Sequence, residues 1–231
     1  MSHCIAILGG TGRMGSGLAM RWASADETVI IGSRDRDRAQ EAADQIRSRL
    51  NRSVSLSGSD YVGAVGEADI VVMTVPFTVQ LKTLKTVREQ LKDGTILMDT
   101  TVPLAANIGG SATQTVAPWQ GSAAQQMAAH APDGVCVVAA FHTIAAGRLA
   151  AWPDEVDGDV LVTGDDTEAK STVGTLIEKI PNLRAIDAGP LEMARITEQL
   201  TALLISIDIK YKAGGAGIRL TRIDSKPGVL T

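Results

Sequence analysis

The first hundred residues alternate short apolar runs with amphipathic segments, and this alternation constrains the fold more than any other feature of the chain. The apolar runs have the length of buried strands, and the amphipathic segments place apolar residues at helical spacing. Strands are expected at residues 3–8, 27–33, 53–58, 69–76 and 95–101, and helices at 12–25, 36–50, 59–68 and 79–91. Regular alternation of strand and helix predicts an α/β fold, in which a parallel sheet carries helices on both faces.

The rest of the chain is irregular at first and then returns to the same pattern. Residues 101–117 show no clear periodicity, and a stretch of that length in a compact protein is either functional or mobile. Further helices are expected at 119–132, 165–180 and 190–211, and further strands at 134–141, 159–164 and 183–189. Glycines end the last helix, and the tail beyond them is expected to be only partly ordered.

Composition argues against several classes of function. The 231 residues carry a formal net charge of −4, and few are aromatic, so neither a duplex-binding face nor stacking platforms for single-stranded nucleic acid are expected. Cys4 and Cys136 lie in apolar runs, which indicates neither a disulfide framework nor a metal site. No apolar run reaches the ~20 residues that span a bilayer, and no signal peptide is recognisable. These features favour a cytoplasmic protein without a membrane partner.

A glycine-rich turn joins the first strand to the first helix. Gly10, Gly12 and Gly15 have the spacing G-x-G-x-x-G in the strand–turn–helix context that this motif requires. Gly10 permits the tight turn, Gly12 lets the backbone approach a pyrophosphate, and Gly15 lets the helix pack closely on the strand. Free N–H groups at the start of the helix then face the anion. The turn predicts a dinucleotide-binding site, with a structural turn that binds no ligand as the alternative.

The end of the second strand indicates which dinucleotide is bound. NAD-binding proteins usually carry Asp or Glu here to hold the ribose hydroxyls, but this chain has Ser33 followed by Arg34, with Arg38 one turn into the helix. A hydroxyl donor and guanidinium groups suit the charge of a 2′-phosphate. The motif predicts a strong preference for NADP. The alternative is a solvated, mixed-charge helix start, which is the expectation for Arg36.

Two more strand ends supply candidate residues. Thr74, Val75 and Pro76 end the strand at 69–76, and ligands of open α/β folds bind along the carboxyl ends of the strands. His142 follows the strand at 134–141 and begins an irregular segment, which suits a loop that faces a substrate; a structural histidine is the alternative of equal weight. Because no hydrolase, zinc-protease or Tyr-x-x-x-Lys motif occurs, no catalytic side chain is assigned.

Seven motifs together resemble those of the F420-dependent NADP oxidoreductases, also called NADPH:F420 reductases. They occur in the family's order over roughly residues 3–220, as GGTGRMGSGLA, IIGSR, VVMTVP, FHTIAAGR, VTGDD, DAGPL and RITEQLTALL. The resemblance implies a Rossmann-type NADP-binding domain at 1–141 and a small C-terminal α/β domain at 142–231, which completes a cleft for the deazaflavin coenzyme F420. It also implies hydride transfer between NADP(H) and F420, a reaction that requires the two rings to be stacked and shielded from water.

The family's functional positions carry over to this chain motif by motif. The pyrophosphate turn corresponds to Thr11, Gly12, Arg13 and Met14, and the 2′-phosphate pocket to Ser33, Arg34 and Arg38. The positions near the ribose and nicotinamide are Thr74, Val75, Pro76, Val102 and Ala146, with Gln80 one helical turn past the proline. The positions beside the deazaflavin are His142, Thr143 and Ile144.

The chain departs from the family's pattern on the deazaflavin side. Ala145 and Ala202 stand where the family often has proline, Phe77 stands where it often has tryptophan, and the tail beyond Leu220 is longer. Two alternatives stay open, the first because of these differences and the second because no obligatory acid or base residue occurs. One is an NADP-dependent reductase of another acceptor, such as an imine, a keto compound or another flavin. The other is a non-catalytic NADPH sensor.

The long helix expected at 190–211 carries two further patterns. Its wide apolar stripe consists of Ile196, Leu200, Leu203, Leu204 and Ile207. Because a small domain covers little of such a face, the stripe predicts a homodimer, with an intramolecular core helix as the alternative. On the same helix Arg195 and Glu198 stand one turn apart, which favours an intrahelical ion pair.

Overall fold

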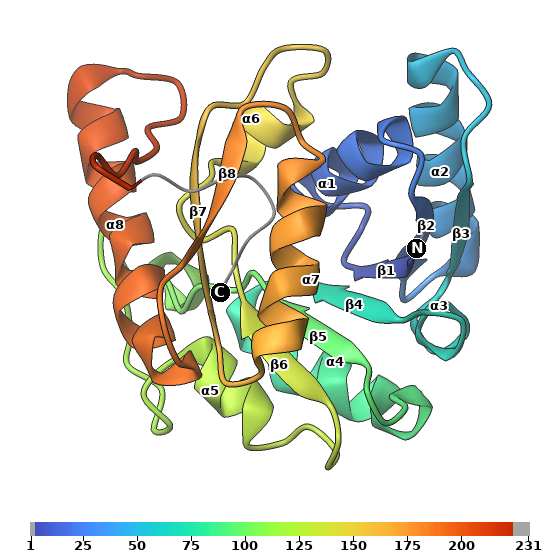
Figure 1. The fold of residues 1–231 in the computed structure, drawn as a ribbon, viewed down its shortest axis with the longest axis horizontal. Coiled ribbons are helices and arrows are strands. Elements are labelled where there is room, and N and C mark those ends of the chain that lie inside the picture. The colour runs from blue at the N-terminus through green and yellow to red at the C-terminus, as the bar shows by residue number, and fades with distance from the viewer. Residues whose placement is uncertain (1–2, 224–231) are drawn as a thin grey trace.

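The computed structural model describes residues 3–223, which form an eight-stranded sheet with helices on both faces (Figure 1). The strand order is β3-β2-β1-β4-β5-β6-β7-β8. The strands are β1 (Cys4–Leu8), β2 (Thr28–Ser33), β3 (Leu56–Asp60), β4 (Ile70–Met73), β5 (Ile96–Asp99), β6 (Cys136–Ala139), β7 (Gly158–Gly164) and β8 (Leu183–Asp187). The first six strands are parallel, whereas β7 is antiparallel to β6 and parallel to β8. The first six strands form the parallel sheet that the alternation predicts, the antiparallel β7 departs from it, and the whole is the Rossmann-like α/β fold that the resemblance implies.

The helices contribute to two hydrophobic cores, one on each face of the sheet. The first core is built with α1 (Arg13–Ser24), α2 (Arg36–Leu50) and α7 (Thr167–Glu178). The second is built with α3 (Tyr61–Gly66), α4 (Gln80–Val87) and α5 (Ala123–Ala128). The remaining helices are α6 (Ala146–Ala150), α8 (Ala194–Tyr211) and the 3₁₀ turns η1 (Phe77–Val79), η2 (Arg88–Gln90), η3 (Ala105–Ile108) and η4 (Leu191–Met193).

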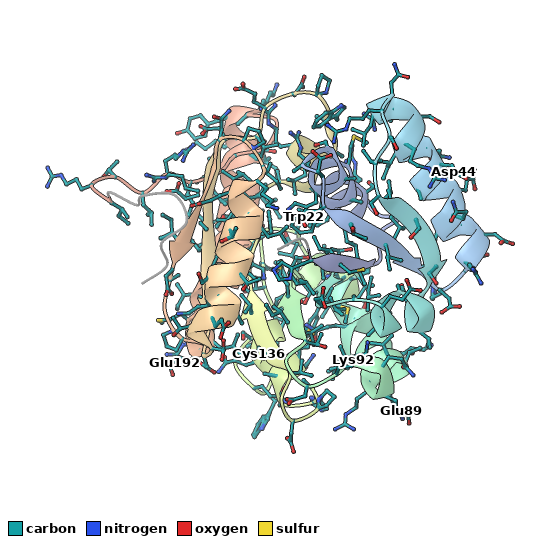
Figure 2. All side chains as sticks on the ribbon, turned by 45° about the vertical axis from the view of Figure 1, so that its right-hand side comes forward. Trp22, Asp44, Glu89, Lys92, Cys136 and Glu192 are labelled. Atoms are coloured by element: carbon teal, nitrogen blue, oxygen red, sulfur yellow. The ribbon has the colours of Figure 1, made fainter. Side chains whose placement is uncertain are left out.

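Strand β1 shows why the sheet is buried on both faces. Ile5 and Ile7 pack in the first core, while Ala6 and Leu8 pack in the second, because successive side chains of a strand point to opposite faces. On α1, Trp22 is fully buried in the first core, and Figure 2 shows it in the interior while the labelled charged side chains point outward. A parallel sheet covered on both faces accounts for the continuous apolar runs of its strands.

The register of β7 brings the C-terminal part of the chain to the ligand-binding edge. Val138 pairs with Gly164 and Ala139 with Thr163, so β6 meets only the end of β7. The preceding residues of β7 pair with β8 and extend beyond the carboxyl end of β6. Continued along the chain, this register places Thr143 opposite Asp159, and the Thr143 hydroxyl donates to the Asp159 carbonyl at 2.8 Å. The starts of β7 and β8 therefore stand beside the segment that follows β6.

Most expected elements are present, with shifted ends. The helix at 36–50 is confirmed as α2. The strand expected at 53–58 is β3, which runs two residues further, and the following helix begins only at Tyr61 because Asp60 caps it by accepting from the Gly63 N–H at 2.8 Å. The irregular stretch at 101–117 contains η3 and an isolated bridge between Leu104 and Thr115. The expectation for the tail beyond residue 223 lies outside the described residues.

The division into a domain at 1–141 and a second at 142–231 stays a prediction. In the structure β7 and β8 extend the same sheet past that boundary. Contacts also cross it, since the buried guanidinium of Arg21 on α1 donates to the carbonyls of Leu149 at 3.1 Å and Asp154 at 2.7 Å. Within residues 3–223, no helix is long and apolar enough to cross a membrane.

Candidate functional site

A cavity of about 560 Å³ lies along the carboxyl ends of β1, β2, β3 and β4. Eight of its lining residues are positions predicted from the sequence: Thr11, Gly12, Ser33, Arg34, Arg38, Thr74, Val75 and Pro76. They come from three separate strand ends, so the parallel sheet itself assembles them. This is the place where open α/β folds bind their ligands.

The glycine turn has the geometry that its spacing predicts. At Gly15 a Cβ atom would lie 2.6 Å from the Gly10 Cα and 2.7 Å from the Thr74 Oγ1, so no side chain fits there. Gly12 is the N-cap of α1 and leaves the helix start without a side-chain cap. The first N–H groups of a helix have no partner within the helix, and here they belong to Arg13 and Met14. The turn therefore offers backbone donors to an anion, and neither of those side chains needs to line the cavity.

The end of β2 places two free cations at the cavity. Ser33 is buried, and its hydroxyl accepts from the Asp35 N–H at 3.3 Å. Asp35 in turn caps α2, because its carboxylate accepts from the Arg38 N–H at 3.2 Å and from the Asp37 N–H. Among the described residues, neither Arg34 nor Arg38 forms an ion pair. Two exposed guanidinium groups without a carboxylate partner suit a phosphate group, and Arg36 is exposed but lies off the cavity.

The cavity includes further residues that were not predicted. They are Gly9, Asp60, Tyr61, Val62, Val79, Lys82, Thr83 and Thr86. Burial raises the pKa of the Tyr61 hydroxyl, while the charge of Arg34 lowers it. Two signals in the sequence point to this group: the end of a third parallel strand, and the helical spacing of residues 82, 83 and 86 on α4, continued by residue 79 just before it.

Five other predicted residues lie outside this cavity. Gly10 is in the turn, where a Cβ atom would lie 2.8 Å from the Ile7 carbonyl oxygen. Val102 is half-buried just after β5, and Ala146 is half-buried at the start of α6. The remaining two are Arg13 and Met14 of the helix start. The structure does not bring Val102 or Ala146 to the same cavity as Arg34.

Gln80 also lies away from the cavity, in a fully buried polar cluster. Its amide nitrogen donates to the Asp99 carboxylate at 2.8 Å and to the Thr101 hydroxyl at 2.8 Å. The Asp99 side chain is fully buried, and burial raises its pKa to about 7 although Thr101 and Gln80 donate to it. The position one turn past Pro76 thus links α4 to the end of β5 and to the start of α5, where its amide nitrogen also donates to the Ala123 carbonyl at 3.1 Å.

The predicted acceptor segment lies on the other side of β6. His142, Thr143 and Ile144 are all buried and line a small cavity of about 80 Å³ together with α8 residues. Neither ring nitrogen of His142 makes a hydrogen bond within the described part of the chain. Burial lowers the pKa of His142 to about 4, although the Thr101 backbone acts in the opposite direction, so the ring is neutral at physiological pH. Unpartnered buried nitrogens leave this ring able to bond to a ligand.

The expected ion pair of Arg195 and Glu198 is wrong. Glu198 is 1% exposed, and its carboxylate accepts from the backbone N–H groups of Ala123 at 2.9 Å and Ala124 at 3.1 Å. Arg195 is exposed and takes no part. Burial, followed by the charge of Asp99, raises the pKa of Glu198 to about 8. The carboxylate is drawn inward because the start of α5 offers two donors there.

Comparison with known proteins gives a consistent result. Residues 4–103 match the family model described as NADP oxidoreductase coenzyme F420-dependent. The F420-dependent NADP reductase of Methanothermobacter thermautotrophicus is 43% identical over 95% of this chain and 95% of its own. That of Methanocaldococcus jannaschii is 41% identical over 95% of this chain and 99% of its own.

Solved structures support the fold. A protein from Arthrobacter sp. FB24, described as an F420-dependent NADP reductase, superposes with a TM-score of 0.80 at 24% identity, over 96% of this chain and 100% of its own. The 3-hydroxyisobutyrate dehydrogenase of Mycobacterium tuberculosis gives a TM-score of 0.58 at 18% identity, over 93% of this chain and 67% of its own. With identity above 40% over nearly its whole length, the chain belongs to the F420-dependent NADP reductase family.

Proposed function

We propose that this protein transfers a hydride between NADP(H) and the deazaflavin coenzyme F420. The observation that carries the proposal is the cavity at the carboxyl ends of β1 to β4, where the glycine turn meets the unpaired Arg34 and Arg38. Curated relatives that align over nearly the whole chain carry the name of this activity. The reaction moves a hydride between C4 of the nicotinamide and C5 of the deazaflavin.

The chain's own residues have binding and positioning roles in this proposal. The N–H groups of Arg13 and Met14 hold the pyrophosphate, and Ser33, Arg34 and Arg38 hold the 2′-phosphate. Thr74, Val75 and Pro76 line the path toward the nicotinamide, which Val102 and Ala146 approach from the ends of β5 and β6. His142, Thr143 and Ile144 bound the deazaflavin. No side chain is required to form a bond with either substrate, so proximity and exclusion of water carry the catalysis.

Steady-state assays with NADPH and oxidised F420 test this function. We expect rapid loss of the visible absorbance of oxidised F420, with much lower rates when NADH replaces NADPH. If the protein oxidised NADPH only with an imine, a keto compound or another flavin, that compound and not F420 would be its acceptor. Tight NADPH binding without turnover of any acceptor would indicate a sensor.

A homodimer is part of the same proposal. On α8 the side chains of Ile196, Leu203 and Ile207 are 50%, 55% and 37% exposed, and they share one face of the helix with half-buried Leu200. A second copy of this chain is the occupant that suits this face, because a self-complementary stripe of one helix forms a two-fold contact with itself. Sedimentation of Leu203→Asp tests it, with Ile209→Asp on a different face as the control. We expect a dimer for the control and a monomer for Leu203→Asp, and a Leu203→Asp dimer would contradict the assignment.

Location and other partners complete the proposal. Both Cys4 and Cys136 are free thiols, as expected in the reducing cytoplasm. The acidic net charge of −4 disfavours nucleic acid as a partner, which leaves the two coenzymes as ligands.

A further inference from the structure

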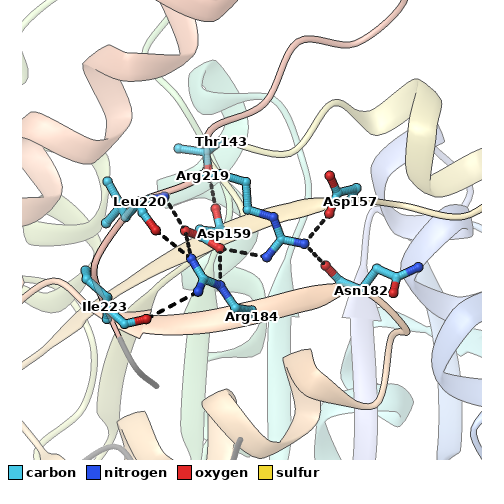
Figure 3. Close-up of polar contacts among 8 residues, drawn as sticks. All are labelled: Thr143, Asp157, Asp159, Asn182, Arg184, Arg219, Leu220 and Ile223. Carbon is cyan, nitrogen blue, oxygen red and sulfur yellow. Dashed lines mark hydrogen bonds and ion pairs between the residues drawn. The ribbon is translucent and has the colours of Figure 1, made fainter. Parts of the chain in front are cut away.

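The segment after α8 folds back across the starts of β7 and β8, and we call residues 212–223 the C-terminal strap. Figure 3 shows Arg219, Leu220 and Ile223 of this strap gathered around Asp159 of β7 and Arg184 of β8. The Asp159 N–H also donates to the Ile218 carbonyl at 2.9 Å. The strap is thus attached to the part of β7 that extends beyond the end of β6.

Asp159 is the centre of this attachment. Its side chain is fully buried, and its carboxylate accepts from Arg184 Nε at 2.7 Å, Arg184 Nη2 at 2.6 Å, Arg219 Nη1 at 3.0 Å and the Leu220 N–H at 2.6 Å. Burial raises the pKa of this carboxyl, but these hydrogen bonds outweigh it and the net pKa lies below its ordinary value. A buried carboxylate with two guanidinium partners is strongly held, because removal of one side leaves a buried charge.

The two arginines also bond to the backbone of neighbouring segments. Arg184 donates to the Leu220 carbonyl at 2.9 Å and reaches the Ile223 carbonyl at 3.4 Å. Arg219 donates to the Asn182 carbonyl at 2.7 Å and forms an ion pair with Asp157. These contacts hold the strap by its main chain as well as by its side chains.

Earlier in the strap, the chain lies against the predicted acceptor segment. The N–H groups of Gly215 and Ala216 donate to the Asp208 carboxylate of α8 at 2.8 and 3.3 Å. Gly215 has φ +118°, and a Cβ atom there would lie 2.6 Å from Arg148 Cγ and 3.1 Å from Ala145 Cβ. Glycine is therefore required both by the backbone conformation and by the close approach.

The strap shares two cavities with the acceptor segment. Gly215 and Ala216 line the cavity of about 80 Å³ that also contains His142. Gly215 and Ala216 also line a second cavity of about 280 Å³, together with Arg148 and Asp157. Thr143 and Ile144 border both cavities. Asp159 meets both sides of this contact, because its carboxylate holds the strap and its carbonyl accepts from the Thr143 hydroxyl at 2.8 Å.

We propose that Asp159 is a positioning residue for the second substrate, because it fixes the strap and Thr143 together so that residues 215–217 wall the acceptor site. This inference rests on the proposed function, since it names the wall of the F420 site. The phosphate groups of NADP(H) bind at the ends of β1 and β2, in a cavity that the strap does not line, and only the nicotinamide reaches the acceptor site. The strap is then a determinant of acceptor affinity, and Arg219 and Gly215 act through it.

Three variants and a control test the proposal by separating the two substrates. Arg219→Ala removes one of the two arginines that bind Asp159. Because the Arg219 side chain is 38% exposed, we expect the fold and the ion pair of Asp159 with Arg184 to remain. Asp159→Asn removes the charge, and Gly215→Ala displaces the strap at its other end. Arg222→Ala is the control, because it changes the same residue type on the same strap outside the cluster in Figure 3.

Loss of about one charge-assisted hydrogen bond predicts a KM for F420 about tenfold higher in Arg219→Ala. We expect the KM for NADPH and kcat to stay within about twofold, and the control to match the unmodified protein.

Hydrogen exchange supplies a readout that a purely structural anchor would not change. In the unmodified protein, we expect F420 to slow exchange of the amides at 213–220, and NADP⁺ alone to leave them unchanged. Unchanged KM for F420 in both Arg219→Ala and Gly215→Ala, or strap exchange that F420 does not slow, would overturn the role of the strap while F420 reduction stands. Failure of the unmodified protein to reduce F420 would overturn the proposed function together with this inference.

Discussion

The nucleotide side and the acceptor side of this molecule use their polar groups in opposite ways. At the ends of β1 and β2, the helix N–H groups and two arginines have no partner among the described residues, and they face an open cavity. Around β7 and α8, the polar groups of Asp159, Thr143 and Glu198 are buried and bonded to other parts of the chain. The nucleotide side therefore offers direct contacts to a ligand. The acceptor side holds apolar walls in place through contacts among distant residues, with His142 as the exception.

The largest expected effect is on the nucleotide side, at Gly15. Gly15→Ala forces a Cβ atom against the Gly10 Cα and the Thr74 hydroxyl, so the turn must shift away from the pyrophosphate position. We expect NADPH binding, measured by fluorescence titration, to weaken by about a hundredfold or more, since overpacking and lost phosphate contacts add. Gly66→Ala is the control, because nothing lies within 4 Å of its Cβ position. Equal affinities in the two variants would contradict the assigned turn.

The next largest effect is expected at Arg34, which tests how the protein discriminates NADPH from NADH. Arg34→Ala should reduce kcat/KM with NADPH by about 30- to 100-fold, because a charge-assisted contact to the 2′-phosphate is lost, and leave kcat/KM with NADH nearly unchanged. Arg36→Ala is the control, since its side chain is exposed away from the cavity. An unaltered ratio of the two efficiencies in Arg34→Ala would remove Arg34 from the 2′-phosphate site.

His142 should show the reverse selectivity. With both ring nitrogens unpartnered in the structure, His142→Ala is expected to raise the KM for F420 by about tenfold, the value of a neutral hydrogen bond, while the NADPH affinity stays constant. Because burial lowers the pKa of His142 to about 4, the ring is neutral from pH 6 to pH 8, and the rise in the KM for F420 should be the same across this range. His130→Ala, at an exposed position after α5, serves as the control. If F420 kinetics are unchanged, His142 is structural.

The last expected effect is on stability rather than on either substrate, and it concerns pH and Glu198. A carboxyl whose pKa rises from 4.5 to about 8 on folding binds its proton more tightly in the native state, so its contribution to stability is present below 4.5 and falls as the pH rises toward 8. Asp99, with a pKa of about 7, changes stability in the same direction. We expect unfolding free energies from denaturant titrations to fall by roughly 3 kcal/mol or more between pH 5 and pH 8, since a carboxyl that stays protonated only in the native state costs about 1.4 kcal/mol per pH unit.

Glu198→Gln should flatten this fall in the unfolding free energy, and Glu192→Gln, at an exposed position of η4, should leave it unchanged. A slope that is the same in both variants would show that Glu198 is ionised throughout this range.

The cavity at the ends of β1, β2 and β4 was largely predictable as a grouping of residues, because most of these residues follow one another in the sequence. The turn from Gly10 to Gly15 and the group from Ser33 to Arg38 each belong to one strand–helix junction, so local spacing determines their geometry. Tyr61 and Lys82 line the same cavity but come from two other elements. Their inclusion depends on the strand order, which places β3 and β4 on either side of β2 and β1.

The contacts around β7 and α8 were less predictable because tertiary contacts overrode local patterns. The spacing of Arg195 and Glu198 favours a surface ion pair, but α5 provides donors 75 and 74 residues away in the sequence. Asp159 stands in the strand GDVLVTG, and Arg184 and Arg219 meet it only after β7, β8 and the strap are assembled. A charged residue within an apolar strand is a signal of such a buried pair, but it does not indicate the partner.

The ladder between β6 and β7 also limits the motions by which substrates can enter and leave. Because the two halves of the chain share one sheet, a hinge rotation that opens the cleft between them would have to break the bonds between Val138, Ala139 and the end of β7. Exchange of the second substrate is then left to motions of the strap and of side chains. Such loop motions occur in nanoseconds to microseconds, whereas hinge motions of whole domains take microseconds to milliseconds. Release of the reduced or oxidised acceptor is therefore expected to be gated locally and to need no large rearrangement of the fold.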